Sequence, residues 1–170
     1  RPGQYAAGLA PPCDPLYWSE ERFSPEVVEA MNEAIDRLRA FSGSGRVHLV
    51  GYSGGAAIAV LVASRRGGIA SLRTVAGNLD TEAVNGHHGV SPLTGSLNPI
   101  DEAGRLAGLP QRHFAGAKDT VVPPFIARSF LERAGDAGGR GLVIVEGVSH
   151  SRGWLERWGE LLTVPLVTAR

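Results

Sequence analysis

The chain has 170 residues, which at about 150 residues per domain allows one domain. Its 17 Lys and Arg residues balance 17 Asp and Glu residues, and zero net charge argues against a nucleic-acid surface that neutralises many phosphates. No apolar run reaches the roughly 20 residues of a membrane span, and the single cysteine, Cys13, excludes an internal disulfide framework and a cysteine-based metal site.

The N-terminal part of the chain predicts an irregular segment followed by one long helix. Residues 1–23 contain four prolines and scattered aromatic residues, which are typical of a loop. Ser24 and Pro25 then form a helix start, because serine caps the first turn and proline suits its first position. Apolar residues at helical spacing predict one buried face, formed by Val27, Met31, Ala34, Ile35, Leu38 and Phe41. Gly43 ends this helix.

After this helix, short β-rich runs alternate with helical patterns. Strands are predicted at 46–50, 71–76, 112–115 and 142–145. Helices are predicted at 56–64, 124–134 and 151–162. This alternation predicts an α/β fold with a mainly parallel sheet flanked by helices. Without repeats or linkers, residues 1–170 form one predicted domain.

One segment interrupts this alternation. Residues 77–110 are rich in glycine and proline, and their pattern predicts at most one short helix, near 100–107. Long excursions between strands are more often functional than idle. We therefore expect residues 77–110 to form a lid or a similar excursion within the domain.

The main chemical signal is the G-x-S-x-G sequence at 51–55. A strand before it and a small-residue helix after it are the setting of a nucleophile elbow, which presents Ser53 on a strained turn. Gly51 and Gly55 are expected to leave room where strand and helix close up. The N–H of Gly54 is expected to point at a substrate oxyanion. The alternative is a plain glycine-rich turn between a strand and a helix.

A serine nucleophile needs a base and a residue that orients the base. Asp119 follows the predicted strand 112–115 through a glycine turn, and His150 follows the strand 142–145. Both therefore lie at carboxyl ends of strands, where catalytic groups of open α/β sheets gather. The order Ser, Asp, His is that of one class of hydrolases. Asp80, just after the strand 71–76, is the alternative acid, and the turn context favours Asp119.

From Arg46 onward the chain resembles the α/β-hydrolases, with Ser53 at the elbow, Asp119 in a G-x-x-D-x-x-V-P turn and His150 after the last strand. The resemblance implies that these residues are nucleophile, orienting acid and general base. It implies a serine hydrolase that cleaves a small-molecule carboxylic ester or related acyl compound without a cofactor. Only the last four strands of that fold are found, and the loop with the second oxyanion donor has no counterpart. Because the chain starts at Arg1 rather than Met, we expect the missing N-terminal strands to lie upstream.

Other chemically active side chains have simpler interpretations. His48 and His113 lie inside predicted strands and are expected to pack there. The pair at 87–88 lacks a third ligand, so we predict no metal site and assign the pair to a solvated loop or lid. Asp101 is expected to be a helix-start charge, and Cys13 a structural residue or one paired with a residue outside this sequence. Trp154 and Trp158 are expected to anchor the last helix to the core. Tyr17 and Trp18 are expected to pack, with the lining of a substrate pocket as the alternative. Tyr52 is a candidate wall of the substrate pocket.

Two rival functions remain open at this point. The chain could be a non-catalytic relative or an inert fragment that binds a partner, because an unpaired first strand at 46–50 would invite pairing with another chain. Alternatively, the acyl group could pass to an acceptor other than water, since the same acyl-enzyme serves both reactions. Separation of Ser53 from His150 in space would favour the first rival.

Overall fold

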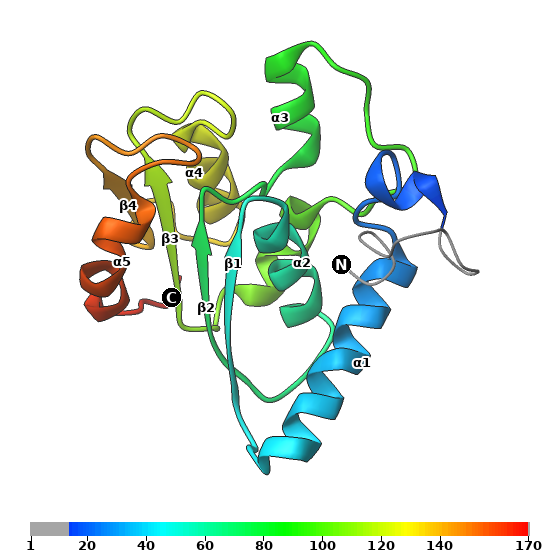
Figure 1. The fold of residues 1–170 in the computed structure, drawn as a ribbon. Helices are drawn as coiled ribbons and strands as arrows, with labels where there is room; N and C mark the ends of the chain where they lie inside the picture. The colour runs from blue at the N-terminus through cyan, green and yellow to red at the C-terminus, as the bar shows by residue number, and fades with distance from the viewer. Residues whose placement is uncertain (1–13, 170) are drawn as a thin grey trace.

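A parallel sheet of four strands lies at the centre of the fold in the computed structural model, which describes residues 14–169 (Figure 1). Its strands are β1 (Val47–Tyr52), β2 (Ile69–Val75), β3 (Gln111–Gly116) and β4 (Leu142–Val145). They lie side by side in chain order, and every neighbouring pair is parallel. The predicted α/β class and all four predicted strands are therefore confirmed. Of the loop expected at 1–23, residues 1–13, with Cys13, lie outside the described residues, and residues 15–18 form a 3-10 helix.

Helices cover both faces of this sheet (Figure 1). Those that cover one face are α2 (Gly54–Ala63), α4 (Pro124–Arg133) and the 3-10 helix η2 (Pro99–Leu106), and their buried side chains pack with Leu72 of β2. The opposite face packs against α5 (Trp154–Thr163), where Trp154 and Trp158 are half-buried against an apolar cluster with Val75 and Phe114. This packing confirms the prediction that the two tryptophans anchor the last helix.

The long helix α1 (Pro25–Ser42) starts as predicted, but fewer of its apolar side chains are buried than predicted. The hydroxyl of Ser24 accepts a hydrogen bond from the N–H of Val27 at 3.4 Å, and Gly43 ends the helix at φ 68°. The first half packs against α2 and the 3-10 helix η1 (Pro15–Trp18), whose Tyr17 joins the same cluster as expected. Trp18, which was also expected to pack, is 40% exposed. Leu38 and Phe41, however, are 65% and 92% exposed.

The difference in helix length explains this exposure. At 1.5 Å per residue, α1 is about 27 Å long and α2 only about 15 Å. The C-terminal turns of α1 therefore extend beyond α2, as Figure 1 shows. The prediction of a continuous buried stripe was wrong for Leu38 and Phe41, because a periodic pattern does not say how far the neighbouring helix reaches.

The segment 77–110 contains two helices rather than at most one. The expected helix near 100–107 is η2, and Asp101 lies in its first turn as predicted. The second is α3 (Thr81–His88), which starts where the carboxylate of Asp80 accepts a hydrogen bond from the N–H of Ala83 and ends at Gly89, φ 63°. In Figure 1, α3 projects beyond the carboxyl ends of the strands. Its role as a lid remains a prediction.

A buried polar chain links β2, β3 and η2. His113 is fully buried, as expected for a core histidine; its Nδ1 lies 2.8 Å from the hydroxyl of Thr74 and its Nε2 3.0 Å from Oε1 of Gln111. The amide nitrogen of Gln111 in turn donates to the carbonyl oxygen of Leu106 at 2.9 Å. Gln111 therefore offers His113 an acceptor, so Nε2 carries the proton and Nδ1 accepts from Thr74.

This histidine should make the protein sensitive to acid. Burial, reinforced by the positive charge of Arg112, lowers the pKa of His113 from 6.5 to about 3. The unfolded chain therefore binds more protons than the folded chain below pH 6.5, and stability falls as the pH falls. At pH 4.5 the loss should be about 2–3 kcal/mol.

Urea unfolding at pH 7 and pH 4.5 measures this loss. His113→Gln removes the titrating group and should flatten the pH dependence. His48 was expected to pack in its strand, but it is exposed, with its Nδ1 2.7 Å from the hydroxyl of Ser71. It provides the control, and His48→Gln should keep the wild-type dependence. A wild-type slope in His113→Gln would contradict the assignment.

Candidate active site

Ser53 occupies the sharp turn between β1 and α2, in a backbone conformation that non-glycine residues rarely adopt. Its φ is 51° and its ψ is −121°. Three backbone hydrogen bonds hold the turn: the N–H of Ser53 donates to Val75 at 2.9 Å, and its carbonyl accepts from Ala56 at 3.0 Å and Asn78 at 3.1 Å. Strain of this kind persists only where the surroundings over-determine it. The predicted strained turn is thus present.

Of the two glycines expected to give this turn room, only Gly51 does so. A Cβ atom on Gly51 would lie 2.5 Å from Cα of Ala56, 2.6 Å from O of Gly55 and 2.7 Å from N of Ala56. A Cβ atom on Gly55 would meet nothing within 4 Å. The steric reason given for Gly55 was wrong, because the helix turns its second residue away from the strand.

Replacing the two glycines by alanine should therefore give opposite results. Gly51→Ala forces backbone atoms in the first turn of α2 to move, which should cost about 3 kcal/mol of stability, at the upper end of overpacking effects. Gly55→Ala places a better helix former in open space and should leave stability unchanged or raise it by up to about 1 kcal/mol. Thermal or urea unfolding of both variants tests this. Equal destabilisation by the two substitutions would contradict it.

Ser53, His150 and Asp119 come together at the carboxyl ends of β1, β4 and β3. Nε2 of His150 lies 3.0 Å from Oγ of Ser53, and Nδ1 lies 2.9 Å from Oδ2 of Asp119. The Asp119 side chain is fully buried and that of His150 is 17% exposed. Because a carboxylate only accepts, Nδ1 of His150 carries the proton and Nε2 is left to accept from the serine hydroxyl.

The loop after β3 fixes the carboxylate of Asp119. Its second oxygen, Oδ1, accepts from the N–H groups of Val121 at 2.9 Å and Val122 at 2.8 Å. Each carboxylate oxygen therefore has a partner, and Oδ2 is directed at His150. Such a fully bonded carboxylate can hold an imidazole in one orientation.

The alternative acid, Asp80, has a different place in the structure. Its Oδ1 caps α3 through Ala83 at 3.1 Å and accepts from the side-chain amide of Asn98 at 3.2 Å. These contacts occupy it at the start of α3. The geometry joins Asp119, and not Asp80, to His150.

The loop that carries His150 packs tightly against the loop that carries Asp119. The N–H of Lys118 donates to the carbonyl oxygen of Val148 at 2.9 Å. A Cβ atom on Gly116 would lie only 2.6 Å from that oxygen. Close approach of the two loops therefore requires glycine at 116. The sequence signal for this was the glycine turn before Asp119, whose steric role only the structure reveals.

Tyr52, the candidate pocket wall, lines two hollows, and neither of them is lined by Ser53, Asp119 or His150. One is an apolar groove of about 290 Å³, lined by Val50, Tyr52, Val75, Trp154, Leu155 and Trp158. The other is about 580 Å³ and is lined by Tyr52 and residues 151–156. The hydroxyl of Tyr52 also donates to the carbonyl oxygen of His150 at 2.8 Å. A role of Tyr52 in substrate binding remains a prediction.

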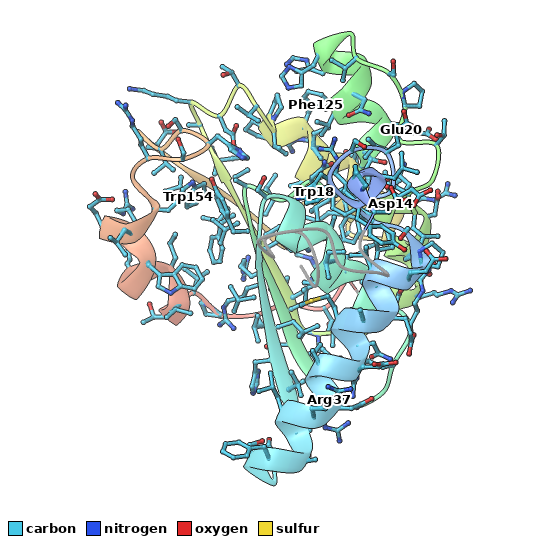
Figure 2. All side chains as sticks on the ribbon, turned by 45° about the vertical axis from the view of Figure 1, so that its right-hand side comes forward. Asp14, Trp18, Glu20, Arg37, Phe125 and Trp154 are labelled. Carbon is cyan, nitrogen blue, oxygen red and sulfur yellow. The ribbon has the colours of Figure 1, made fainter. Side chains whose placement is uncertain are left out.

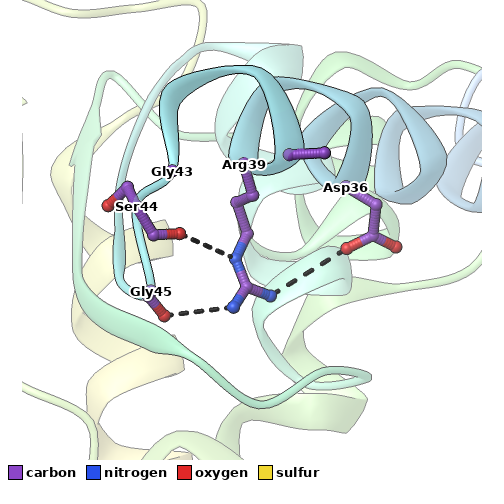
Figure 3. Close-up of a pocket in the computed structure, with 6 residues that line it drawn as sticks. Asp36, Arg39, Gly43, Ser44 and Gly45 are labelled. Atoms are coloured by element: carbon purple, nitrogen blue, oxygen red, sulfur yellow. Dashed lines mark hydrogen bonds and ion pairs between the residues drawn. The ribbon is translucent and has the colours of Figure 1, made fainter.

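Two further features lie away from this site. A hollow of about 370 Å³ at the end of α1 is lined by Arg39, which donates to the carbonyl oxygens of Ser44 at 3.5 Å and Gly45 at 3.1 Å (Figure 3). These bonds tie down the chain that leaves α1, which is a structural role. Within residues 14–169, no group of three or more His, Cys, Asp or Glu side chains could hold a metal ion.

The histidine pair, expected on a solvated loop or lid, lies in the last turn of α3 and packs onto the loop after Asp119 and the start of α4. Nε2 of His88 lies 2.8 Å from the carbonyl oxygen of Val121, and the His87 ring contacts Phe125 edge-on. The pair therefore connects α3 to this loop.

In the part of the chain that the structure describes, no helix is long and apolar enough to cross a membrane.

Comparisons with known proteins support the fold described above. No family model and no curated protein matches the chain. Solved hydrolases do: MGS-MChE2, an α/β hydrolase from the metagenome of lagoon sediments of Mar Chica, Morocco, has a TM-score of 0.62 at 22% identity, over 87% of this chain and 72% of that one. The Pyrococcus furiosus esterase Pf2001 has a TM-score of 0.62 at 16% identity, over 82% of this chain.

A puromycin hydrolase is also similar, with a TM-score of 0.59 at 22% identity over 73% of this chain. The chain spans 22% of the length of that hydrolase and 62% of the length of the esterase. At these identities the likeness concerns the fold. The four parallel strands and their helices thus form part of an α/β-hydrolase fold.

Proposed function

We propose that this chain carries the catalytic triad of a serine hydrolase that cleaves a carboxylic ester or related acyl compound. The observation that carries the proposal is the continuous hydrogen-bonded path from Ser53 Oγ through His150 to Asp119, at 3.0 Å and 2.9 Å. Nucleophile, base and orienting acid are within the reach that proton transfer requires. The structural neighbours named above, an esterase among them, support the same chemistry.

In this proposal, the reaction has two halves. Ser53 Oγ attacks the acyl carbon while its proton passes to Nε2 of His150, and Asp119 stabilises the imidazolium that forms. His150 then returns the proton to the departing alkoxide, which leaves as an alcohol and gives an acyl-enzyme on Ser53. Water attacks that ester with His150 again as base, the carboxylic acid leaves, and Ser53 regains its proton.

The oxyanion of each tetrahedral intermediate would lie at the start of α2. Gly54 is the first residue of that helix, and N–H groups of a first helical turn have no partner within the helix. The positive end of the helix dipole favours a negative charge there. The N–H of Gly54 is therefore the proposed donor, a contact of about 3–4 kcal/mol in the transition state.

A separation of Ser53 from His150 beyond hydrogen-bond reach would have favoured the rival hypothesis, a non-catalytic binding module. Their 3.0 Å separation favours the hydrolase. No described strand pairs with the outer edge of β1, which is the feature that motivated the rival. Acyl transfer uses the same acyl-enzyme, so product analysis with added alcohols separates it from hydrolysis.

Labelling with a fluorophosphonate tests the proposal directly. Such a probe is attacked by an activated serine, and mass spectrometry should find the adduct on Ser53. Hydrolysis of short-chain nitrophenyl esters should disappear in step with labelling. A chain that stays unlabelled at Ser53, or that keeps its hydrolysis after complete labelling, would refute the proposal.

A further inference from the structure

The carbonyl oxygen of His150 accepts two side-chain hydrogen bonds. The hydroxyl of Tyr52 donates to it at 2.8 Å, and Nε1 of Trp154 donates to it at 2.8 Å. A carbonyl oxygen has two lone pairs, so both of its acceptor positions are used. The backbone of the proposed general base is therefore held on two sides.

The two donors come from different elements. Tyr52 is the last residue of β1 and immediately precedes Ser53, whereas Trp154 is the first residue of α5. Figure 2 shows Trp154 at the start of α5, next to the sheet. One bond thus ties the His150 loop to the strand that presents the nucleophile, and the other ties it to the helix that follows.

Ring packing adds to the contact with Tyr52. The rings of Tyr52 and His150 lie 5.5 Å apart at 38°. The same tyrosine therefore contacts the imidazole and holds the backbone from which the imidazole projects. Tyr52 is 45% exposed, so it contributes less to the core than a buried aromatic residue would.

We propose that Tyr52 and Trp154 are positioning residues that hold His150 at hydrogen-bond distance from Ser53. This inference rests on the proposed function of the three residues as a triad. A displacement of about 1 Å in a catalytic group can cost on the order of a hundredfold in rate. Fixing the His150 carbonyl to the residue before Ser53 makes base and nucleophile move as one unit.

The phenol suits this task over a wide pH range. Burial, followed by the negative charge of Asp119, raises the pKa of Tyr52 above its ordinary value of 10.0. The hydroxyl therefore stays protonated at neutral pH and remains a donor. The indole N–H of Trp154 is a donor at every pH.

Two substitutions remove the donors. Tyr52→Phe keeps the six-membered ring, whereas Trp154→Phe replaces the indole by a smaller aromatic ring. Each should lower kcat by about 3- to 10-fold with little change in KM, because one hydrogen bond is lost and the other donor remains. The double variant should lose more than the product of the single effects, since the His150 carbonyl then has neither partner. The rate of fluorophosphonate labelling should fall in parallel.

Proton NMR gives a readout that does not depend on turnover. The low-field resonance of the Nδ1 proton shared by His150 and Asp119 should shift or broaden in the double variant. Trp158→Phe is the matched control, because Trp158 lies one turn further along α5 and lines the same groove without taking part in the bonds to the His150 carbonyl. It should keep the wild-type resonance.

The outcomes distinguish the two proposals. If wild-type Ser53 is labelled but the double variant keeps wild-type kcat and resonance, the positioning role is overturned and the triad stands. If kcat falls equally in Trp158→Phe and follows the melting temperature across all variants, the role is structural, which also overturns it. If wild-type Ser53 is not labelled, the proposed function fails and the inference fails with it.

Discussion

Ser53→Ala should reduce ester hydrolysis by a factor of about 10⁶, the loss expected when a triad acts as a unit. Alanine removes Oγ, and with it both the attacking atom and the hydrogen bond to Nε2 of His150 at 3.0 Å. Without a nucleophile no acyl-enzyme forms, and only slow attack by water on a bound ester remains. Initial rates with a nitrophenyl ester measure the loss.

The control for this variant is a second serine, which lies outside the candidate site. Ser44 is exposed at the end of α1, and Ser44→Ala should keep both hydrolysis and labelling. Ser53→Ala should also fold normally, since the backbone bonds of the turn do not involve Oγ. If Ser53→Ala keeps more than a thousandth of the wild-type rate of hydrolysis, the assignment of Ser53 as the nucleophile is contradicted.

Asp119→Asn should lower kcat by about 10⁴, as expected when a histidine is held in the wrong tautomer. The asparagine Oδ1 can still accept from Val121 and Val122, so the loop keeps its shape. Its amide nitrogen, however, would donate to Nδ1 of His150. Nε2 would then carry the proton and could not take the one on Ser53.

Asp80→Asn provides the comparison, because Asp80 was the rival acid. Asparagine also caps helices well, so α3 should keep its start and kcat should stay within a factor of about two to three of wild type, as for most surface changes. The melting temperatures of both variants separate catalytic from structural effects. A larger loss in Asp80→Asn than in Asp119→Asn would transfer the role of the orienting acid to Asp80.

The sheet and the candidate triad could be predicted because their signals are local. The turn at 51–55 combines a sequence motif with a preceding strand and a following helix, and both were visible in the hydrophobic pattern. Asp119 and His150 each follow a short β-rich run directly, so the parallel topology alone brings them to one edge of the sheet. Their hydrogen-bond distances then depend on packing between loops.

What the sequence did not reveal depends on contacts between distant residues. The exposure of Leu38 and Phe41 follows from the short length of α2 relative to α1. The helix α3 was not predicted although Asp80 and Gly89 are good capping residues, because the helix is short and Gly86 interrupts its pattern. The two hydrogen bonds to the His150 carbonyl join residues that are 98 positions and four positions apart in the sequence. No sequence pattern predicts the bond between the more distant pair.

The chain-order sheet also spreads the proposed site along the chain. Each strand pairs with strands that are its neighbours in sequence, so the parts of the site belong to successive strand–helix units. Ser53 follows the first of the four strands and His150 follows the last. A chain in which β4 and α5 have not yet docked would already present the serine, but without its base. If Ser53 is the nucleophile, its activation would therefore require the final strand–helix unit to be in place.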